Sequence, residues 1–289
     1  MKFKQLDAAG EIVKPQRGNK FKKLIDNLLE HGGVKKKYRN LLLDDKAVIT
    51  RYNDAFTSQY ANPVYNYEFY EYLGDAIANS SISWYLARRF PQLCNPTNIG
   101  LLSTLYNNQK STLIFSDISV SLGFAPFISA DTNEFSPKHQ KFLYEDVFEA
   151  FFGVTAYTID EKFGYGLGQP ICYRIIEWIY DQRHISLEFA DVKDAKTRLK
   201  ELAEKHPQLA RIKAFTYRPQ NLNDTFYITV EMRDINSGKI TEMGHGENPI
   251  KAEAEKQAAE ETLHMLEQEG IKLEVSRSHQ PQLKTFERK

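Results

Sequence analysis

Residues 67–76 read Tyr67-Glu68-Phe69-Tyr70-Glu71-Tyr72-Leu73-Gly74-Asp75-Ala76. They lie in a helical pattern over 65–90 that stops before Pro91. At about 100° per residue, Glu68, Glu71 and Asp75 fall within roughly 60° of one another on such a helix. Three carboxylates on one strip repel one another and weaken a helix slightly. A bound divalent cation would neutralise the strip, whereas the ordinary interpretation is a solvated acidic surface.

The same helix carries an apolar sector that we expect to anchor it to the core. This sector consists of Phe69, Leu73, Ala76 and Ile77. It is separate from the acidic strip, so the helix would pack on one side and present carboxylates beside the packed side.

A second helix, expected over 136–159, repeats this arrangement. Asp146 and Glu149 are spaced i, i+3 on one side. The expected packing surface consists of Val147, Phe148, Phe151 and Phe152. If the apolar sides of both helices pack together, four carboxylates meet. Oxygen ligands without Cys or His suit hard cations such as Mg²⁺ or Mn²⁺, which activate water for phosphodiester hydrolysis.

Other catalytic centres find little support in the sequence. A di-iron carboxylate bundle needs paired Glu-x-x-His motifs on its helices, and among the expected helices the last one alone carries such a motif, Glu261–His264. Motifs for a phosphate-binding glycine loop, a nucleophile elbow or a zinc site are missing from the sequence. We therefore expect no organic cofactor.

Length and composition predict a globular protein of two domains. The chain has 289 residues, of which 42% are hydrophobic and 26% charged. No apolar run approaches the roughly 20 residues that span a bilayer, and the basic N-terminus lacks the apolar stretch of a secretory signal. Cys94 and Cys172 are far apart and are expected as free thiols, which indicates an intracellular, cytoplasmic protein. With 38 basic and 38 acidic residues, nucleic acid could bind only to local basic patches.

The first 185 residues contain no clear strand, so we expect an all-α domain over 21–182. Its other helical patterns lie over 21–31, in two short segments between 98 and 123, and over 171–181. Residues 1–20 are expected to form a mobile basic arm. The basic run that includes Lys35, Lys36, Lys37 and Arg39 is expected to form a turn and is interpreted as a solvated surface, with an RNA contact as the alternative.

A linker over 183–193 precedes a smaller α+β domain over 194–268. The order is α-β-β-β-α: a helix from Asp194 to Lys205, strands over 214–217, 226–233 and 239–244, and a helix over 249–267. Asn236-Ser237-Gly238 predicts the turn between the last two strands. A polar tail over 269–289 follows.

Two of these motifs resemble a known family. The stretch over 68–76 resembles the ribonuclease III signature Glu-x-x-Glu-Phe-Leu-Gly-Asp-Ala/Ser, and Glu145–Gly153 is similar to its second motif, Asp-x-x-Glu-Ala-x-x-Gly. Residues 194–268 resemble a double-stranded-RNA-binding domain. The resemblance covers about residues 20–268. It implies a homodimeric, metal-dependent endoribonuclease that cuts double-stranded RNA, leaving 5′-phosphate and 3′-hydroxyl ends with a short 3′ overhang.

The resemblance also implies roles for single residues. Glu71, Asp75, Asp146 and Glu149 would be the catalytic ligands of Mg²⁺, for which Mn²⁺ can substitute, and Glu68 would assist. Tyr72 would lie at the subunit boundary. Two positions depart from the signature, since Tyr67 replaces an Asn and Tyr70 replaces a Leu, and both changes alter packing and polar support at the site.

The C-terminal domain departs further from its family. The expected loop over 219–224 lacks the usual His, and Glu253 and Glu255 stand beside Lys251 in the last helix. Residues 191–270 carry 12 basic and 15 acidic residues, so we expect weak RNA binding. The candidate RNA-contacting residues are Lys196, Lys200, Glu201, Lys251 and Lys256. The alternative function is a catalytically silent relative that binds double-stranded RNA or scaffolds a ribonucleoprotein; such a relative would be expected to have lost one of the four carboxylates.

Overall fold

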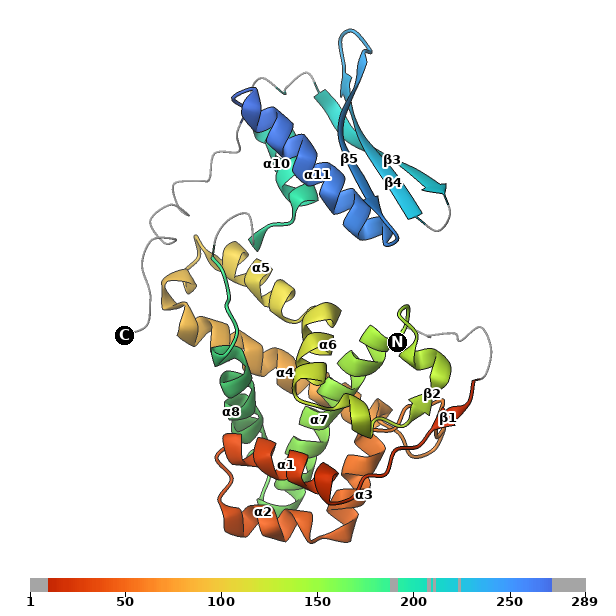
Figure 1. Ribbon diagram of the computed structural model, residues 1–289. Coiled ribbons are helices and arrows are strands. Elements are labelled where there is room, and N and C mark those ends of the chain that lie inside the picture. Colours follow the sequence, from red (N-terminus) through yellow and green to blue (C-terminus); the bar gives the residue numbers. More distant parts are fainter. Residues whose placement is uncertain (1–9, 188–191, 207–208, 210–211, 223–224, 272–289) are drawn as a thin grey trace. The chain divides into compact units, whose positions relative to one another are not determined.

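The structure is a computed structural model that describes residues 10–187, 192–206, 209, 212–222 and 225–271 (Figure 1). The chain divides into two compact units, 1–185 and 186–289, and this boundary falls inside the linker expected over 183–193. The first nine residues of the expected basic arm and the expected polar tail from residue 272 lie outside the described residues. Of the described helices, none combines the length and the apolar character needed to cross a membrane.

The first unit is helical and is built around α7 (Gln140–Phe163) (Figure 1). The helices packed directly on it are α3 (Lys46–Ala55), α4 (Glu68–Arg89), α6 (Thr112–Ser121) and α8 (Gly168–Asp181). The remaining helices of this unit are α1 (Asn19–His31), α2 (Lys36–Leu43), α5 (Ile99–Gln109), and the 3₁₀ helices η1 (Pro91–Leu93), η2 (Ala125–Phe127) and η3 (Thr132–Phe135). A helix that is apolar on nearly every side is stable only when other helices enclose it, as they do here.

Aromatic side chains fill the core around α7. Phe148 packs against Phe115 with ring centres 4.6 Å apart, and Phe151 packs against Phe124 at 5.3 Å. Burying each such ring contributes about 1.5–3 kcal/mol. The four residues expected as the packing surface, Val147, Phe148, Phe151 and Phe152, are all fully buried, so that prediction is confirmed.

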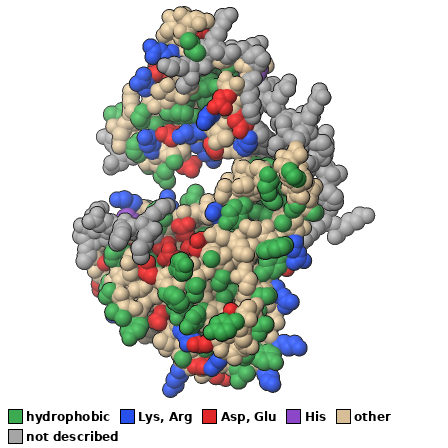
Figure 2. All heavy atoms as spheres, turned by 180° about the vertical axis from the view of Figure 1, so that it is seen from behind, with side chains coloured by type: hydrophobic (Ala, Val, Ile, Leu, Met, Phe, Trp, Pro, Cys, Tyr) green, Lys and Arg blue, Asp and Glu red, His purple; other side chains and the backbone are tan. Residues whose placement is uncertain are grey.

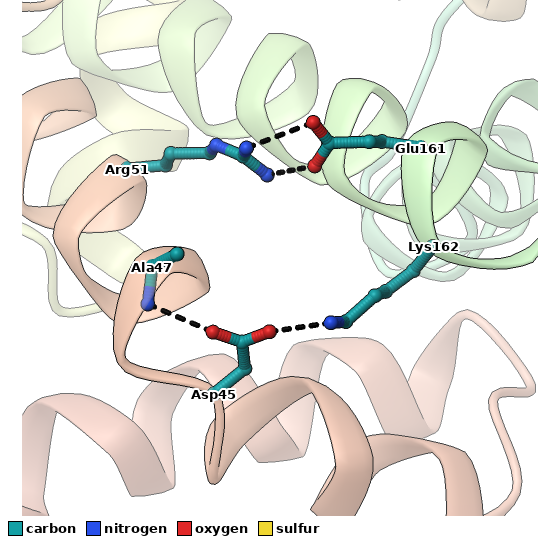
Figure 3. A network of polar contacts seen from close by, with 5 residues as sticks. All are labelled: Asp45, Ala47, Arg51, Glu161 and Lys162. Carbon is teal, nitrogen blue, oxygen red and sulfur yellow. Dashed lines mark hydrogen bonds and ion pairs between the residues drawn. The ribbon is translucent and has the colours of Figure 1, made fainter.

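Polar contacts join α3 to the C-terminal end of α7 (Figure 3). Asp45 caps α3 by accepting from the backbone N–H of Ala47 at 2.8 Å and also pairs with Lys162 at 2.5 Å. Arg51 pairs with both carboxylate oxygens of Glu161, one of them at 2.9 Å. Partly exposed pairs of this kind each contribute about 1 kcal/mol or less to stability.

The basic run near residue 36 has exposed lysines at 35, 36 and 37, as expected, but the predicted turn and the predicted exposure of Arg39 are wrong. The run begins helix α2, and Arg39 is 7% exposed. Its guanidinium donates to Asp26 at 2.7 Å, to Glu30 at 3.0 Å and to the carbonyl of Val34 at 2.9 Å. Carboxylates of α1 thus compensate the burial of this charge. The spacing of residues within the basic run does not predict these partners.

The segment before α1 is attached to the first unit, not a mobile arm, over residues 10–18. Strand β1 (Ile12–Val13) pairs antiparallel with β2 (Ala130–Asp131), which adds a short sheet to the domain expected to be all-α. The guanidinium of Arg17 donates to carbonyls and hydroxyls of two neighbouring segments: Asn53, Phe56, Thr57, Phe127 and Ser129. Burial lowers the pKa of Arg17 to about 10. Five donors on one rigid group explain how a single residue holds both segments.

The second unit has the expected α-β-β-β-α order. Its elements are α10 (Ala195–Lys205), β3 (Ile212–Leu222), β4 (Thr225–Asp234), β5 (Ile240–Asn248) and α11 (Lys251–Gln268), with antiparallel strands in the order β3-β4-β5. Asp194 caps α10, as predicted, by accepting from the N–H of Thr197 at 3.0 Å. Val230 and Ala258 are fully buried in the core between the sheet and the helices.

Strand β3 is longer than predicted and includes most of the expected RNA-contacting loop. Pro219, predicted to lie in that loop, pairs with Ile228, and the ladder continues to Leu222, which pairs with Thr225. Because β3 is an edge strand, a proline that lacks an N–H donor is tolerated there.

Candidate active site

Helices α4 and α7 approach each other backbone to backbone at two glycines. A Cβ on Gly74 would lie 1.7 Å from the carbonyl oxygen of Glu149, and a Cβ on Gly153 would lie 1.9 Å from that of Tyr70. Any side chain at either position would force the helices apart. Since Asp75 follows Gly74 and Glu149 is itself at the contact, this crossing brings the acidic residues of both helices together.

The buried face of α4 differs from the predicted one, because two of the four expected anchors, Leu73 and Ile77, are only half-buried and the other two are exposed. Gly74 and Ala78 face the core together with Tyr70, which is 8% exposed. Phe69, expected as an anchor, is 52% exposed, and Ala76 is also exposed. The prediction was wrong because hydrophobicity undervalues small residues, which pack a helix by letting its backbone approach.

The electrostatics of Glu149 show that the expected carboxylates lie near one another. Its side chain is 8% exposed, and burial is the largest cause that raises its pKa to about 9. The negative charges of Asp75, Glu145, Glu71 and Asp146 raise it further. Figure 2 shows acidic side chains gathered on one face of this unit.

The acidic residues differ in exposure. Asp146 is 6% exposed, whereas Asp75 is exposed and Glu71 is intermediate. Glu68 and Glu71 occupy the first turn of α4, where the helix dipole favours negative charge by about 0.3–1 kcal/mol each. This offsets part of the repulsion along the strip.

The carboxylate oxygens of the expected ligands suit a hard divalent cation, although the side chains are not gathered closely enough to coordinate one. Among the described residues, no three Asp, Glu, His or Cys side chains stand close enough to hold a metal ion as they are placed. The four expected ligands nevertheless offer only carboxylate oxygens, which suit Mg²⁺ or Mn²⁺. Burial and, less strongly, neighbouring acids raise the pKa of the Glu149 carboxyl group, and a bound cation would stabilise its ionised form.

Tyr67, expected to alter packing and polar support near the site, contacts one of the expected ligands directly. Its hydroxyl donates to Oδ2 of Asp146 at 2.9 Å, and its side chain is buried. Its position immediately before the acidic stretch indicated that it lies near the site. The helical spacing of α4 does not indicate its partner on α7.

Three of the four lysines expected to contact RNA form ion pairs within the second unit. Lys196 lies 2.5 Å from Glu255, and Lys251 lies 3.8 Å from the other oxygen of the same carboxylate. The other expected residues are Lys200, which is 3.9 Å from Glu204, Glu201, which accepts from Lys193 at 2.5 Å, and Lys256, which is exposed on α11. On the visible face of this unit, basic and acidic side chains alternate closely (Figure 2).

Large apolar side chains are exposed at the N-terminal end of α4. Tyr72, expected at a subunit boundary, is 76% exposed. Phe69 is also exposed, and its ring contacts that of Tyr157 with centres 5.7 Å apart. Val64 and Tyr65, just before the helix, are exposed as well.

Comparison with known proteins identifies relatives but no matching family model. A frog virus 3 protein provisionally named ribonuclease 3 is 35% identical over 251 residues, which is 85% of this chain but only 62% of that protein. A protein of Invertebrate iridescent virus 6 with the same name is 34% identical, over 86% of this chain and 88% of its own length. Ribonuclease 3 of Lactobacillus acidophilus is 32% identical, over 74% of this chain and 89% of its own.

Among solved structures, the nuclease domain of ribonuclease III from Campylobacter jejuni matches 56% of this chain and 97% of that domain, with a TM-score of 0.40 and 24% identity. The sequence identity to the iridescent virus and Lactobacillus proteins, by contrast, extends over most of both chains. On that identity, the protein belongs to the ribonuclease III family of endoribonucleases.

Proposed function

We propose that the protein hydrolyses double-stranded RNA with Mg²⁺, or Mn²⁺ in its place, held by Glu71, Asp75, Asp146 and Glu149. The observation that carries this proposal is the glycine crossing of α4 and α7, which places the acids of both helices around the buried Glu149. Membership of the ribonuclease III family supports the same reaction class.

The proposed chemistry follows from where the carboxylates lie. A bound cation would supply an activated water and stabilise the charge that develops on the phosphate. Asp146 and Glu149, both buried, would hold the cation from the core side. Asp75 is exposed, so a phosphate can approach beside it, and Glu68 would assist from the first turn of α4. The expected products carry 5′-phosphate and 3′-hydroxyl ends with a short 3′ overhang.

The proposed assembly is a homodimer in which each copy cuts one strand. The exposed apolar side chains of Phe69 and Tyr72 at the start of α4 support a symmetric interface there. Light scattering at micromolar concentration should give about twice 33.4 kDa. Tyr72→Asp should shift this mass toward the monomer and make nicked duplexes accumulate.

The second unit is proposed to be a double-stranded-RNA-binding domain that holds RNA weakly. Its α-β-β-β-α order supports the assignment, and Lys196, Lys200, Glu201, Lys251 and Lys256 are the proposed contacts. The ion pairs of Lys196 and Lys251 with Glu255 reduce the charge available to phosphates.

Cleavage of a long perfect RNA duplex tests the proposed activity. The substrate is offered with Mg²⁺, with Mn²⁺ and with EDTA, beside a single strand of the same sequence. We expect cutting of the duplex with either metal and no cutting in EDTA. Binding without cutting under every condition would support the silent scaffold instead.

A further inference from the structure

Tyr67 connects the start of α4 to α7, and these two helices carry the proposed metal ligands. Its hydroxyl donates to Oδ2 of Asp146 at 2.9 Å, where Asp146 belongs to α7 and Tyr67 immediately precedes α4. The Tyr67 side chain is 2% exposed, and Asp146 is 6% exposed. A hydrogen bond to a charged carboxylate in such a buried place is stronger and more directional than one at the surface.

The phenol is held in place independently of the helix crossing. The backbone N–H of Tyr67 donates to the carbonyl of Thr57 at 2.9 Å, and Thr57 forms a bridge with Ser129. The guanidinium of Arg17 donates to the hydroxyls of both Thr57, at 3.2 Å, and Ser129, at 3.0 Å. The backbone of Tyr67 is therefore attached to a frame that the N-terminal segment fixes.

Another acid lies near the same pair. Glu134 is buried, accepts from the hydroxyl of Ser58 at 2.6 Å and from the N–H of Asp131 at 2.9 Å, and is close enough for its charge to act on both Tyr67 and Asp146. Repulsion from Glu134 would favour other rotamers of Asp146. A donor fixed at Oδ2 opposes that rotation.

We infer that Tyr67 is a positioning residue: it holds Oδ2 of Asp146 and thereby fixes the orientation of the carboxylate that would bind the metal. The inference rests on the proposed function, because it assigns Asp146 as a ligand. Tyr67 does not touch the metal or the RNA in this role. Its loss should therefore weaken metal binding more than it weakens the reaction of the fully loaded enzyme.

The test compares Tyr67→Phe with Tyr52→Phe in the full-length protein. Tyr52 is also a buried tyrosine of the first unit, but its hydroxyl is hydrogen-bonded to Thr155 at 3.0 Å. Mn²⁺ binding is measured by calorimetry without RNA, and the Mg²⁺ dependence of duplex cleavage is measured in parallel. For Tyr67→Phe we expect the Mn²⁺ Kd and the Mg²⁺ midpoint to rise about tenfold. We expect kcat at saturating Mg²⁺ to stay within about threefold, and Tyr52→Phe to bind Mn²⁺ as the unmodified protein does.

A wild-type Mn²⁺ Kd for Tyr67→Phe, or an equal loss in Tyr52→Phe, would overturn the inference. Asp146→Asn separates this failure from failure of the proposed function. If Asp146→Asn binds Mn²⁺ normally, the proposed metal site itself is wrong; if it loses Mn²⁺ while Tyr67→Phe does not, only the role of Tyr67 fails. In the Asp146→Asn background, Tyr67→Phe should have no further effect on metal binding, and a full additive loss there would also count against the inference.

Discussion

Gly74 and Gly153 face each other where α4 and α7 cross, and a Cβ on Gly153 would lie 2.9 Å from the backbone nitrogen of Gly74. The obstructing atoms are backbone atoms, which cannot rotate away as a side chain can. The distance between the two acidic strips is therefore set by two residues that carry no functional group.

Replacing either glycine by alanine should separate the helices and move the carboxylates. We expect Gly74→Ala and Gly153→Ala to lower the free energy of unfolding by about 1–3 kcal/mol or more and to abolish cleavage. The matched control is Gly100→Ala, an exposed position in α5 where a Cβ meets nothing within 4 Å. Urea unfolding and the cleavage assay provide the measurements. Wild-type stability in Gly74→Ala would show that the crossing is looser than described.

Glu149 should make the stability of the metal-free protein depend on pH. Its pKa is raised in the folded protein from 4.5 to about 9, so the folded state binds the proton more tightly than the unfolded chain does. The free energy of unfolding should therefore fall as pH rises through this window. Glu149→Gln should flatten the decline, whereas Asp117→Asn, at an exposed position of α6, should not.

Adding Mg²⁺ should raise the melting temperature more at pH 8 than at pH 6, because the metal must displace that proton. Melting curves with and without Mg²⁺ at several pH values test both statements. A Glu149→Gln profile parallel to the wild-type profile would contradict them.

Glu255 should limit RNA binding by the second unit. It pairs with Lys196 and lies 3.8 Å from Lys251, so Glu255→Gln should leave the ammonium groups of both lysines available to phosphates. We expect duplex affinity to rise several-fold and the salt dependence to steepen, by up to about one unit of slope for each additional phosphate that a lysine neutralises. Binding is measured at two salt concentrations in an Asp75→Asn background, to prevent cutting. Glu260→Gln, an exposed acid of the same helix, is the control, and equal affinities for the two variants would refute the prediction.

Arg17 should contribute strongly to the stability of the first unit. Arg17→Ala removes donors from the carbonyls of Asn53, Phe56 and Phe127, which then lack those bonds. We expect a loss of about 2–4 kcal/mol in the free energy of unfolding. Lys14→Ala, an exposed residue of the same segment, should change it by less than about 0.5 kcal/mol. If the two variants are equally stable, the segment over 10–18 is not attached as described.

The sequence predicted the acidic residues and, in the second unit, the order of the elements, but not the contacts that bring the acidic residues together. Charge spacing along two helices identified both acidic strips, because that information is local. The face on which α4 packs depends on how closely Gly74 approaches α7, and the sequence of α4 alone does not indicate that distance. The same limit applies to Tyr67, whose partner Asp146 lies 79 residues further along the chain.

Other features escaped prediction because tertiary contacts override local signals. Helices α2 and α3 have short, charged sequences, and ion pairs such as Arg39–Asp26 and Arg51–Glu161 connect them to their neighbours. Strand β3 continues through Pro219 because its free edge needs no N–H donor there.

Single-turnover cleavage of duplex RNA by carboxamide variants tests the central claim, that the acids at the α4–α7 crossing form a metal-dependent catalytic centre. The variants are Glu71→Gln, Asp75→Asn, Asp146→Asn and Glu149→Gln, with Asp117→Asn as the control. Each of the four should fold, as circular dichroism can show, and should cleave at least about a hundredfold more slowly with Mg²⁺, while the control cleaves normally. Undiminished cleavage by Glu149→Gln, or cleavage by the unmodified protein in EDTA, would contradict the account.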